Sequence, residues 1–143
     1  MMIEQLVTSL IASAAFGLIF NVPKKLLGHC GFVGMIGWFI YISFVEHKAD
    51  SVFATFVSAF FIAVVSQLFA RMYKTPITVF SISGIIPLVP GGMAYEAMRY
   101  VVMNDYSMAI QLAAKAFMIS GAIAMGIVFS EVANQLVKKR TSR

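Results

Sequence analysis

The residues best suited to chemistry in this sequence lie together between positions 81 and 99, inside an otherwise apolar run. Pro87 and Pro90 interrupt the run, and Gly91 and Gly92 follow directly. Each proline lacks a backbone N–H and so leaves a helical carbonyl, Ser83 or Ile86, without its usual partner, while glycine accepts backbone angles that other residues resist. A broken helix presents free carbonyls before the break and free N–H groups, at the positive end of a dipole, after it. Such groups can bind a small anion or zwitterion, so we predict a binding site here.

Polar side chains on both sides of the break could complete this site. Ser81 and Ser83 offer hydroxyls before it, and Glu96 and Arg99 stand three positions apart after it, where they can pair on one helical face. A deep Glu96 would be a candidate proton carrier, whereas the alternatives are that it complements the helix N-terminus and that Arg99 snorkels to the interface. Lys115 pairs with Glu96 or an anionic substrate if it lies deep, and snorkels if it lies near the surface.

Composition places these residues in a membrane protein. The chain has 143 residues, of which 60% are hydrophobic and 12% charged, and its mean hydropathy is +0.87. A crossing of the roughly 30 Å hydrocarbon core takes about 20 apolar residues, so we expect one all-α transmembrane domain over residues 1–143 with about five segments. Paired carboxylates on a water-exposed platform, a Ser/His/Asp arrangement, a phosphate loop and a zinc motif are all missing, so we expect neither an enzyme nor a cofactor.

The cysteine, the two histidines and the net charge argue against a disulfide, a metal site and nucleic-acid binding. Cys30 is the one cysteine and cannot form an internal disulfide, and His29 and His47 do not make a metal site with it. The net charge of +5 is dispersed between apolar segments, which argues against nucleic-acid binding. Glu4 precedes the first apolar segment, where a signal peptide would be basic, so we expect that segment to be retained.

The expected segments cover residues 5–20, 26–45, 52–70, 76–104 (broken at 87–92) and 107–137. The last is longer than a perpendicular crossing requires, so it must tilt or project into water. The second carries a glycine at every third position, namely Gly28, Gly31, Gly34 and Gly37. A dinucleotide fingerprint would need a preceding strand and different spacing, so we interpret this track as a close-packing surface for another helix or subunit.

The basic residues predict the topology. Eight of the 11 lysines and arginines lie in alternate connections: Lys24, Lys25, Arg71, Lys74, Lys138, Lys139, Arg140 and Arg143. By the positive-inside rule these connections are cytoplasmic, which puts the N-terminus outside and the C-terminus inside. Residues 76–104 must then cross once, as a discontinuous helix. The alternative is a hairpin that returns to the cytoplasm.

The stretch Ser83-Gly-Ile-Ile-Pro-Leu-Val-Pro-Gly-Gly-Met-Ala-Tyr-Glu96 strongly resembles the threonine/serine exporter family of the ThrE type. Segment number and chain length resemble the small subunit of its two-component exporters. The resemblance implies an inner-membrane location and a larger homologous partner subunit with a soluble domain and five further helices, to which this chain would be the inverted counterpart. It implies threonine, serine or succinate as substrates, with export driven by the membrane potential or the proton gradient.

We therefore predict a five-segment, multi-pass subunit of an exporter of small carboxylates, in which the carboxylate binds at the broken fourth segment. Two alternatives remain open from the sequence. One is a non-transporting membrane scaffold that recruits a partner through the glycine track, and the other is a homo-oligomeric channel with a pore on its symmetry axis.

Overall fold

The computed structural model of the chain describes residues 1–142, and these residues are helical throughout, with short connections and no β-strand. The helices are α1 (Met2–Ile19), α2 (Leu27–Glu46), α3 (Ser51–Tyr73), α4 (Thr78–Ile85), α5 (Gly91–Val102) and α6 (Tyr106–Thr141), with short 3-10 turns at Lys24–Leu26 and Ile86–Leu88. In the described part of the chain, 4 helices are long and apolar enough to cross a membrane, and the bent pair α4–α5 makes up to 5. The predicted all-helical membrane fold is confirmed.

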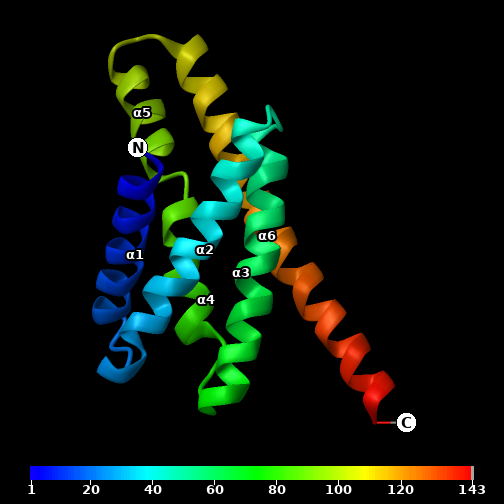
Figure 1. The fold of residues 1–143 in the computed structure, drawn as a ribbon. Coiled ribbons are helices and arrows are strands. Elements are labelled where there is room, and N and C mark those ends of the chain that lie inside the picture. Colours follow the sequence, from blue (N-terminus) through cyan, green and yellow to red (C-terminus); the bar gives the residue numbers. More distant parts are fainter. Residues whose placement is uncertain (143) are drawn as a thin grey trace.

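The helices form a bundle in which α2 is central and packs against α1, α3 and α4 (Figure 1). Helix α6 packs along α3 and, at its start, against α5. Helix α5 continues toward the end of the bundle to which α4 points, beyond the N-terminal end of α1. The two chain termini consequently lie toward opposite ends of the molecule, and the last turns of α6 leave the bundle.

The helix ends follow from local chemistry. Left-handed residues stand after four of the helices: Asn21 (φ 57), Lys48 (φ 60), Lys74 (φ 52) and Asn104 (φ 61). A left-handed residue turns the chain away from the helical path and so ends the helix. At the start of α6 the Asp105 side chain accepts a hydrogen bond from the Met108 backbone N–H at 3.2 Å, which satisfies one of the free donors of the first turn.

The core between α1, α2, α3 and α4 combines a few large side chains with many small ones. Phe80, Ile62 and Val33 have no exposed surface. A Cβ at Gly31 would lie 2.9 Å from the Leu10 carbonyl oxygen of α1, and one at Gly34 would lie 2.6 Å from the Ser13 Cβ. These helices therefore approach each other more closely than any larger residue at those positions would allow.

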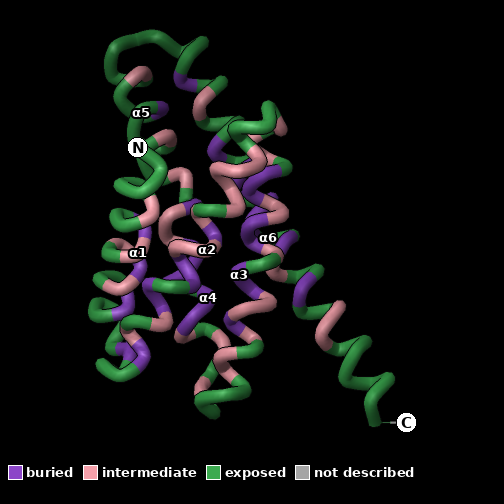
Figure 2. The backbone as a smooth tube through the Cα atoms, in the orientation of Figure 1, coloured by how far each residue is buried: buried purple, intermediate pink, exposed green. Residues whose placement is uncertain are grey.

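The other two glycines of the track, Gly37 and Gly28, do not pack on α1. A Cβ at Gly37 would lie 2.6 Å from Ile62 Cγ1, so this position packs on α3, whereas a Cβ at Gly28 would meet nothing within 4 Å. The track thus winds from the α1 side to the α3 side of α2, and Gly28 lies outside both contacts. Figure 2 shows that the buried residues gather inside the bundle while the final turns of α6 are exposed.

The basic clusters lie toward one end of the molecule. The α1–α2 connection with Lys24 and Lys25, the end of α3 with Lys74, and the C-terminal end of α6 are all near the bottom of Figure 1. The α2–α3 and α5–α6 connections lie at the opposite end. This distribution is the one that the positive-inside rule requires, and the orientation in a membrane stays a prediction.

Candidate functional site

The predicted break lies between α4 and α5, whose axes are bent by 48° with respect to each other. Helix α4 tightens into the 3-10 turn Ile86–Leu88, in which the Val89 N–H donates to the Ile86 carbonyl at 3.2 Å. The Gly91 N–H donates to the Val89 carbonyl at 2.8 Å, and α5 begins with the Ala94 N–H donating to the Pro90 carbonyl at 3.0 Å. The Ile86 carbonyl therefore lacks its usual partner at position 90, as predicted, but it is not free, because the tighter turn supplies the Val89 N–H in its place.

The two glycines of the break do not adopt unusual backbone angles. No glycine among the described residues has a positive φ, so the expectation that Gly91 and Gly92 provide special angles was wrong. Both are exposed, and a Cβ at either would meet nothing within 4 Å. Their contribution is space, because the first turn of α5 is left uncovered. The Gly91 N–H is already used by the Val89 carbonyl, whereas the Gly92 N–H, as a first-turn donor, has no partner within the helix.

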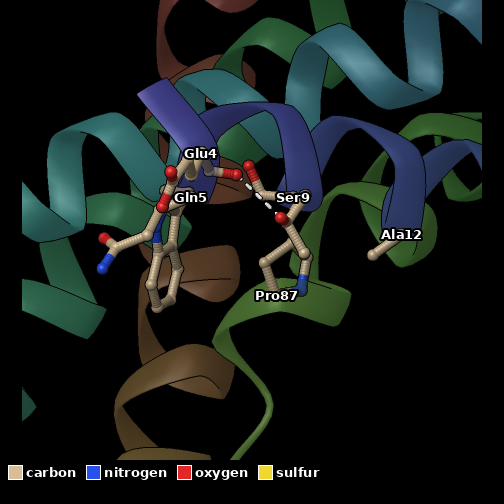
Figure 3. A pocket seen from close by; sticks show the side chains of 7 residues that line it. Glu4, Gln5, Ser9, Ala12 and Pro87 are labelled. Carbon is tan, nitrogen blue, oxygen red and sulfur yellow. Dashed lines mark hydrogen bonds between the residues drawn. The ribbon is translucent and has the colours of Figure 1, made fainter. Parts of the chain in front are cut away.

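A cavity and a groove adjoin the break on different sides. The first, which we call the polar cavity after the polar side chains of α1 at its edge, has a volume of about 420 Å³ and lies between α1, α2 and the break. It is open to the outside, and most of its surface is apolar. Its lining consists of Glu4, Gln5, Thr8, Ser9, Ala12, Trp38 and Pro87. Figure 3 shows Glu4, Gln5, Ser9 and Ala12 along α1, with Pro87 facing them from the break. Residues from the start of the chain and residues from its middle thus line the same polar cavity.

The second, which we call the α5–α6 groove, has a volume of about 440 Å³. It is lined by Val89, Pro90, Gly91, Ala94, Ala97, Met98, Ala113, Ala116, Phe117 and Ser120. Most of these residues are small or apolar, and Ser120 directs its hydroxyl to the Ala116 carbonyl of its own helix at 2.9 Å. The groove is therefore an apolar approach to the N-terminal end of α5.

The predicted serines lie away from both spaces. Ser81 and Ser83 are buried, with 8% and 1% of their surface exposed, and the Ser83 hydroxyl donates to the Val79 carbonyl one turn earlier at 3.2 Å. Ser83 lines a separate pocket of about 270 Å³ beside the α1–α2 connection. Neither Ser81 nor Ser83 lines the polar cavity or the α5–α6 groove.

The predicted charged residues are exposed and scattered. Glu96, Arg99 and Lys115 all lie on the surface of the single chain and line neither space beside the break. The Arg99 guanidinium lies 5.4 Å from the centre of the neighbouring Tyr100 ring. The pairing of Glu96 with Arg99 across one helical face stays a prediction. Ala97 is the buried residue of α5, and this burial fixes the rotation that turns its neighbours outward.

Sequence reasoning missed the polar residues that do adjoin the break. Glu4 entered only as an argument against a signal peptide, and Trp38 was not among the predicted site residues. The available signal was the spacing of Glu4 and Thr8, four positions apart, which puts two polar side chains on one face of an apolar helix. Nothing in the sequence said that this face meets Pro87.

A further polar contact joins α3 to α6 near the basic end. The Arg71 guanidinium donates to the Asn134 side-chain oxygen. Gln67 donates to Glu131 at 3.5 Å, and Gln135 donates to the same carboxylate at 3.3 Å. These bonds hold the projecting end of α6 against α3.

Among the described residues, no three His, Cys, Asp or Glu side chains come together as a group that could hold a metal ion. His29 instead bonds the Tyr73 hydroxyl through Nε2 at 2.7 Å. This hydrogen bond links α2 to the end of α3.

Comparison with known proteins supplies the family. The family model described as "Threonine/Serine exporter, ThrE" matches residues 5–133. No solved structure matches the chain. The match covers the bundle, the break and most of α6, so it extends far beyond the short motif around the prolines. The chain is thus a multi-pass membrane protein that belongs to the threonine/serine exporter family.

Proposed function

We propose that this chain is one subunit of an inner-membrane exporter of small carboxylates, either amino acids of the threonine/serine type or dicarboxylates of the succinate type. The observation that carries the proposal is the bent α4–α5 pair, with its uncovered first turn of α5, in a chain of an exporter family. Helix N-termini hold carboxylates through free N–H groups and a positive dipole end. Transporters use broken helices in this way near the middle of the membrane.

In this proposal α4 and α5 form one discontinuous crossing. Irregular backbone at membrane depth needs protein or water around it, because lipid cannot satisfy its polar groups. The polar cavity and the α5–α6 groove lie on different sides of the break and provide such surroundings. The substrate carboxylate binds at the first turn of α5, to the Gly92 N–H, and Pro87 and Pro90 keep this backbone from closing into a continuous helix.

The packing of α4 and α5 indicates which movement exposes the site to each side of the membrane in turn. Helix α5 packs mainly against α6, whereas α4 packs mainly against α2 and α3. The backbone between them, Val89 and Pro90, belongs to neither helix. We propose that repacking of α5 and α6 about this point alternates access to the site.

The exposed charges support a partner subunit. Charged side chains at membrane depth face protein or water and pair with other groups, yet Glu96, Arg99 and Lys115 are exposed in the single chain. We propose that they face a pathway shared with a larger homologous subunit that carries a soluble domain. There Lys115 and Arg99 would compensate the substrate carboxylate, and Glu96 would take part in charge compensation or proton coupling.

Reconstitution tests the function. The chain is placed in proteoliposomes alone and together with the larger homologous subunit, and efflux of labelled L-threonine, L-serine and succinate is measured with and without an imposed proton gradient. The proposal expects efflux of at least one of these carboxylates from vesicles that contain both subunits. Efflux from neither preparation would favour the scaffold, and equal efflux from the chain alone would favour a homo-oligomeric channel.

A further inference from the structure

Positive charge gathers at one end of the molecule, which we call the basic end. Lys24 and Lys25 lie in the α1–α2 connection, Arg71 and Lys74 lie at the end of α3, and three more basic residues stand in the last turns of α6 (Figure 1). All of these side chains are exposed. The basic end therefore offers many free cations on one side of the molecule.

Acidic residues do not balance this charge. Of the 6 in the chain, all but Glu131 stand in the first turn of α1, at the α2–α3 connection, in α5 or directly before α6, toward the opposite end. The Glu131 carboxylate accepts hydrogen bonds from Gln67 at 3.5 Å and from Gln135 at 3.3 Å, so amides already occupy it. The basic end consequently presents a positive surface, which attracts anionic groups.

The last turns of α6 also have an exposed apolar side. Asn134 faces α3, where it accepts a hydrogen bond from the Arg71 guanidinium. Val132 and Leu136 stand two positions before and after Asn134, so both point to the opposite side of the helix. Their surfaces are 48% and 64% exposed. This side of α6 is therefore free to contact a partner outside the chain.

Two cations continue this apolar side toward the helix end. Lys139 and Arg140 follow Leu136 by three and four positions, which places them next to it, one turn further along. A phospholipid has the same order of groups, namely acyl chains that need an apolar surface and then a phosphate that attracts cations. Helix α6 has 36 residues and is about 54 Å long, compared with a hydrocarbon core of roughly 30 Å, so its end can reach the headgroups.

We propose that the end of α6 binds anionic phospholipid, with Lys139 and Arg140 on the phosphate and with Val132 and Leu136 along an acyl chain. An acidic protein segment would satisfy the two cations but not the apolar side that leads to them. A lipid of the phosphatidylcholine type carries the same phosphate, yet its own quaternary ammonium offsets that charge. The proposed surface therefore discriminates by the net charge of the headgroup. It does not depend on which substrate the chain transports.

Lipid binding to the purified full-length chain tests the proposal. The chain in uncharged detergent micelles is titrated with dioctanoyl phosphatidylglycerol or dioctanoyl phosphatidylcholine, and native mass spectrometry counts the bound lipids. We expect the wild type to bind the anionic lipid at least tenfold more tightly, and we expect this preference to decrease as NaCl is added.

A double variant locates the surface. Lys139→Gln with Arg140→Gln should weaken phosphatidylglycerol binding at least tenfold and leave phosphatidylcholine binding unchanged. Lys24→Gln with Lys25→Gln is the matched control, because it removes the same charge from the same end at a place away from α6. We expect this control to bind phosphatidylglycerol within twofold of the wild type. All four side chains are exposed, and circular dichroism verifies that both variants keep their helices.

Several results would overturn the proposal. Equal affinity of the wild type for the two lipids would show that no anionic headgroup is selected and would leave the basic end to another partner, such as an acidic protein. Equal losses in the two double variants would show that the charge of the whole end acts without a site on α6. Free glycerol 1-phosphate that displaces phosphatidylglycerol at an equal concentration would show that the acyl chain contributes nothing.

Discussion

Substitution of Gly34 by alanine, which adds a single methyl group, tests how closely α1 packs on α2. The Cβ of an alanine there would lie 2.6 Å from the Ser13 Cβ, whereas ordinary contacts begin at 3.4 Å. Both residues are buried, so the two helices must separate by roughly 1 Å or the side chains must leave their rotamers. Overpacking of this kind costs about 1–3 kcal/mol. This cost is partly offset, because alanine stabilises a helix by about 1 kcal/mol relative to glycine.

Gly28→Ala is the matched control, because a Cβ at Gly28 meets nothing within 4 Å. It gains the same helix preference without the overlap, so the difference in unfolding free energy between the two variants isolates the packing cost. We expect Gly34→Ala to be about 1–3 kcal/mol less stable than Gly28→Ala. The assay is unfolding of the purified chain in mixed micelles with increasing SDS, followed by circular dichroism.

A double variant checks the cause. Ser13→Gly removes the overlapping side chain, so it should recover much of the stability that Gly34→Ala loses. Equal stability of Gly34→Ala and Gly28→Ala would refute the α1–α2 packing described here. Failure of Ser13→Gly to rescue Gly34→Ala would assign the loss to another neighbour.

Three further results are expected. Gly126→Ala should destabilise the chain by about 1–3 kcal/mol in the same assay, because its Cβ would lie 2.8 Å from a backbone oxygen of α3; unchanged stability would contradict the α3–α6 contact. Arg71→Ala removes the bond to Asn134 and should speed tryptic cleavage at the projecting end of α6, and cleavage at the wild-type rate would show that this bond does not hold the helix. In a chain freed of its one native cysteine, an impermeant maleimide applied to intact cells should label Ala49→Cys but not Lys139→Cys, and the reverse pattern would invert the predicted topology.

Much of the fold could be predicted because the membrane restricts the choices. Long apolar runs can only be helices where lipid cannot satisfy backbone polar groups, and the positions of Pro23, Pro76 and Pro87 mark where those helices end or bend. The ends at Asn21, Lys48, Lys74 and Asn104 depend on left-handed residues that charge and hydropathy do not reveal. For that reason the predicted segments start and end within a few residues of the observed helices.

Of the candidate site, only the position of the break could be predicted from the sequence. Pro87 and Pro90 break the helix because they lack N–H groups, whatever surrounds them. Which side chains meet the break depends on how each helix is rotated. Consecutive residues point about 100° apart on a helix, so burial of Ala97 against α6 turns Glu96 outward. Glu4 lies far from Pro87 in the sequence, and only the packing of α1 brings it to the cavity.

Substrate efflux by a complex in which Gly91 is replaced by leucine tests directly whether the break is the substrate site. A Cβ at Gly91 meets nothing within 4 Å, and the same is true of Gly121 on α6, so neither substitution forces a clash within the chain at that atom. Gly91 lines the α5–α6 groove beside the free N–H groups of α5, whereas Gly121 does not. We expect Gly91→Leu to abolish efflux while membrane insertion and assembly remain normal, and we expect Gly121→Leu to transport like the wild type. Efflux at the wild-type rate from Gly91→Leu would contradict the assignment of the break as the substrate site.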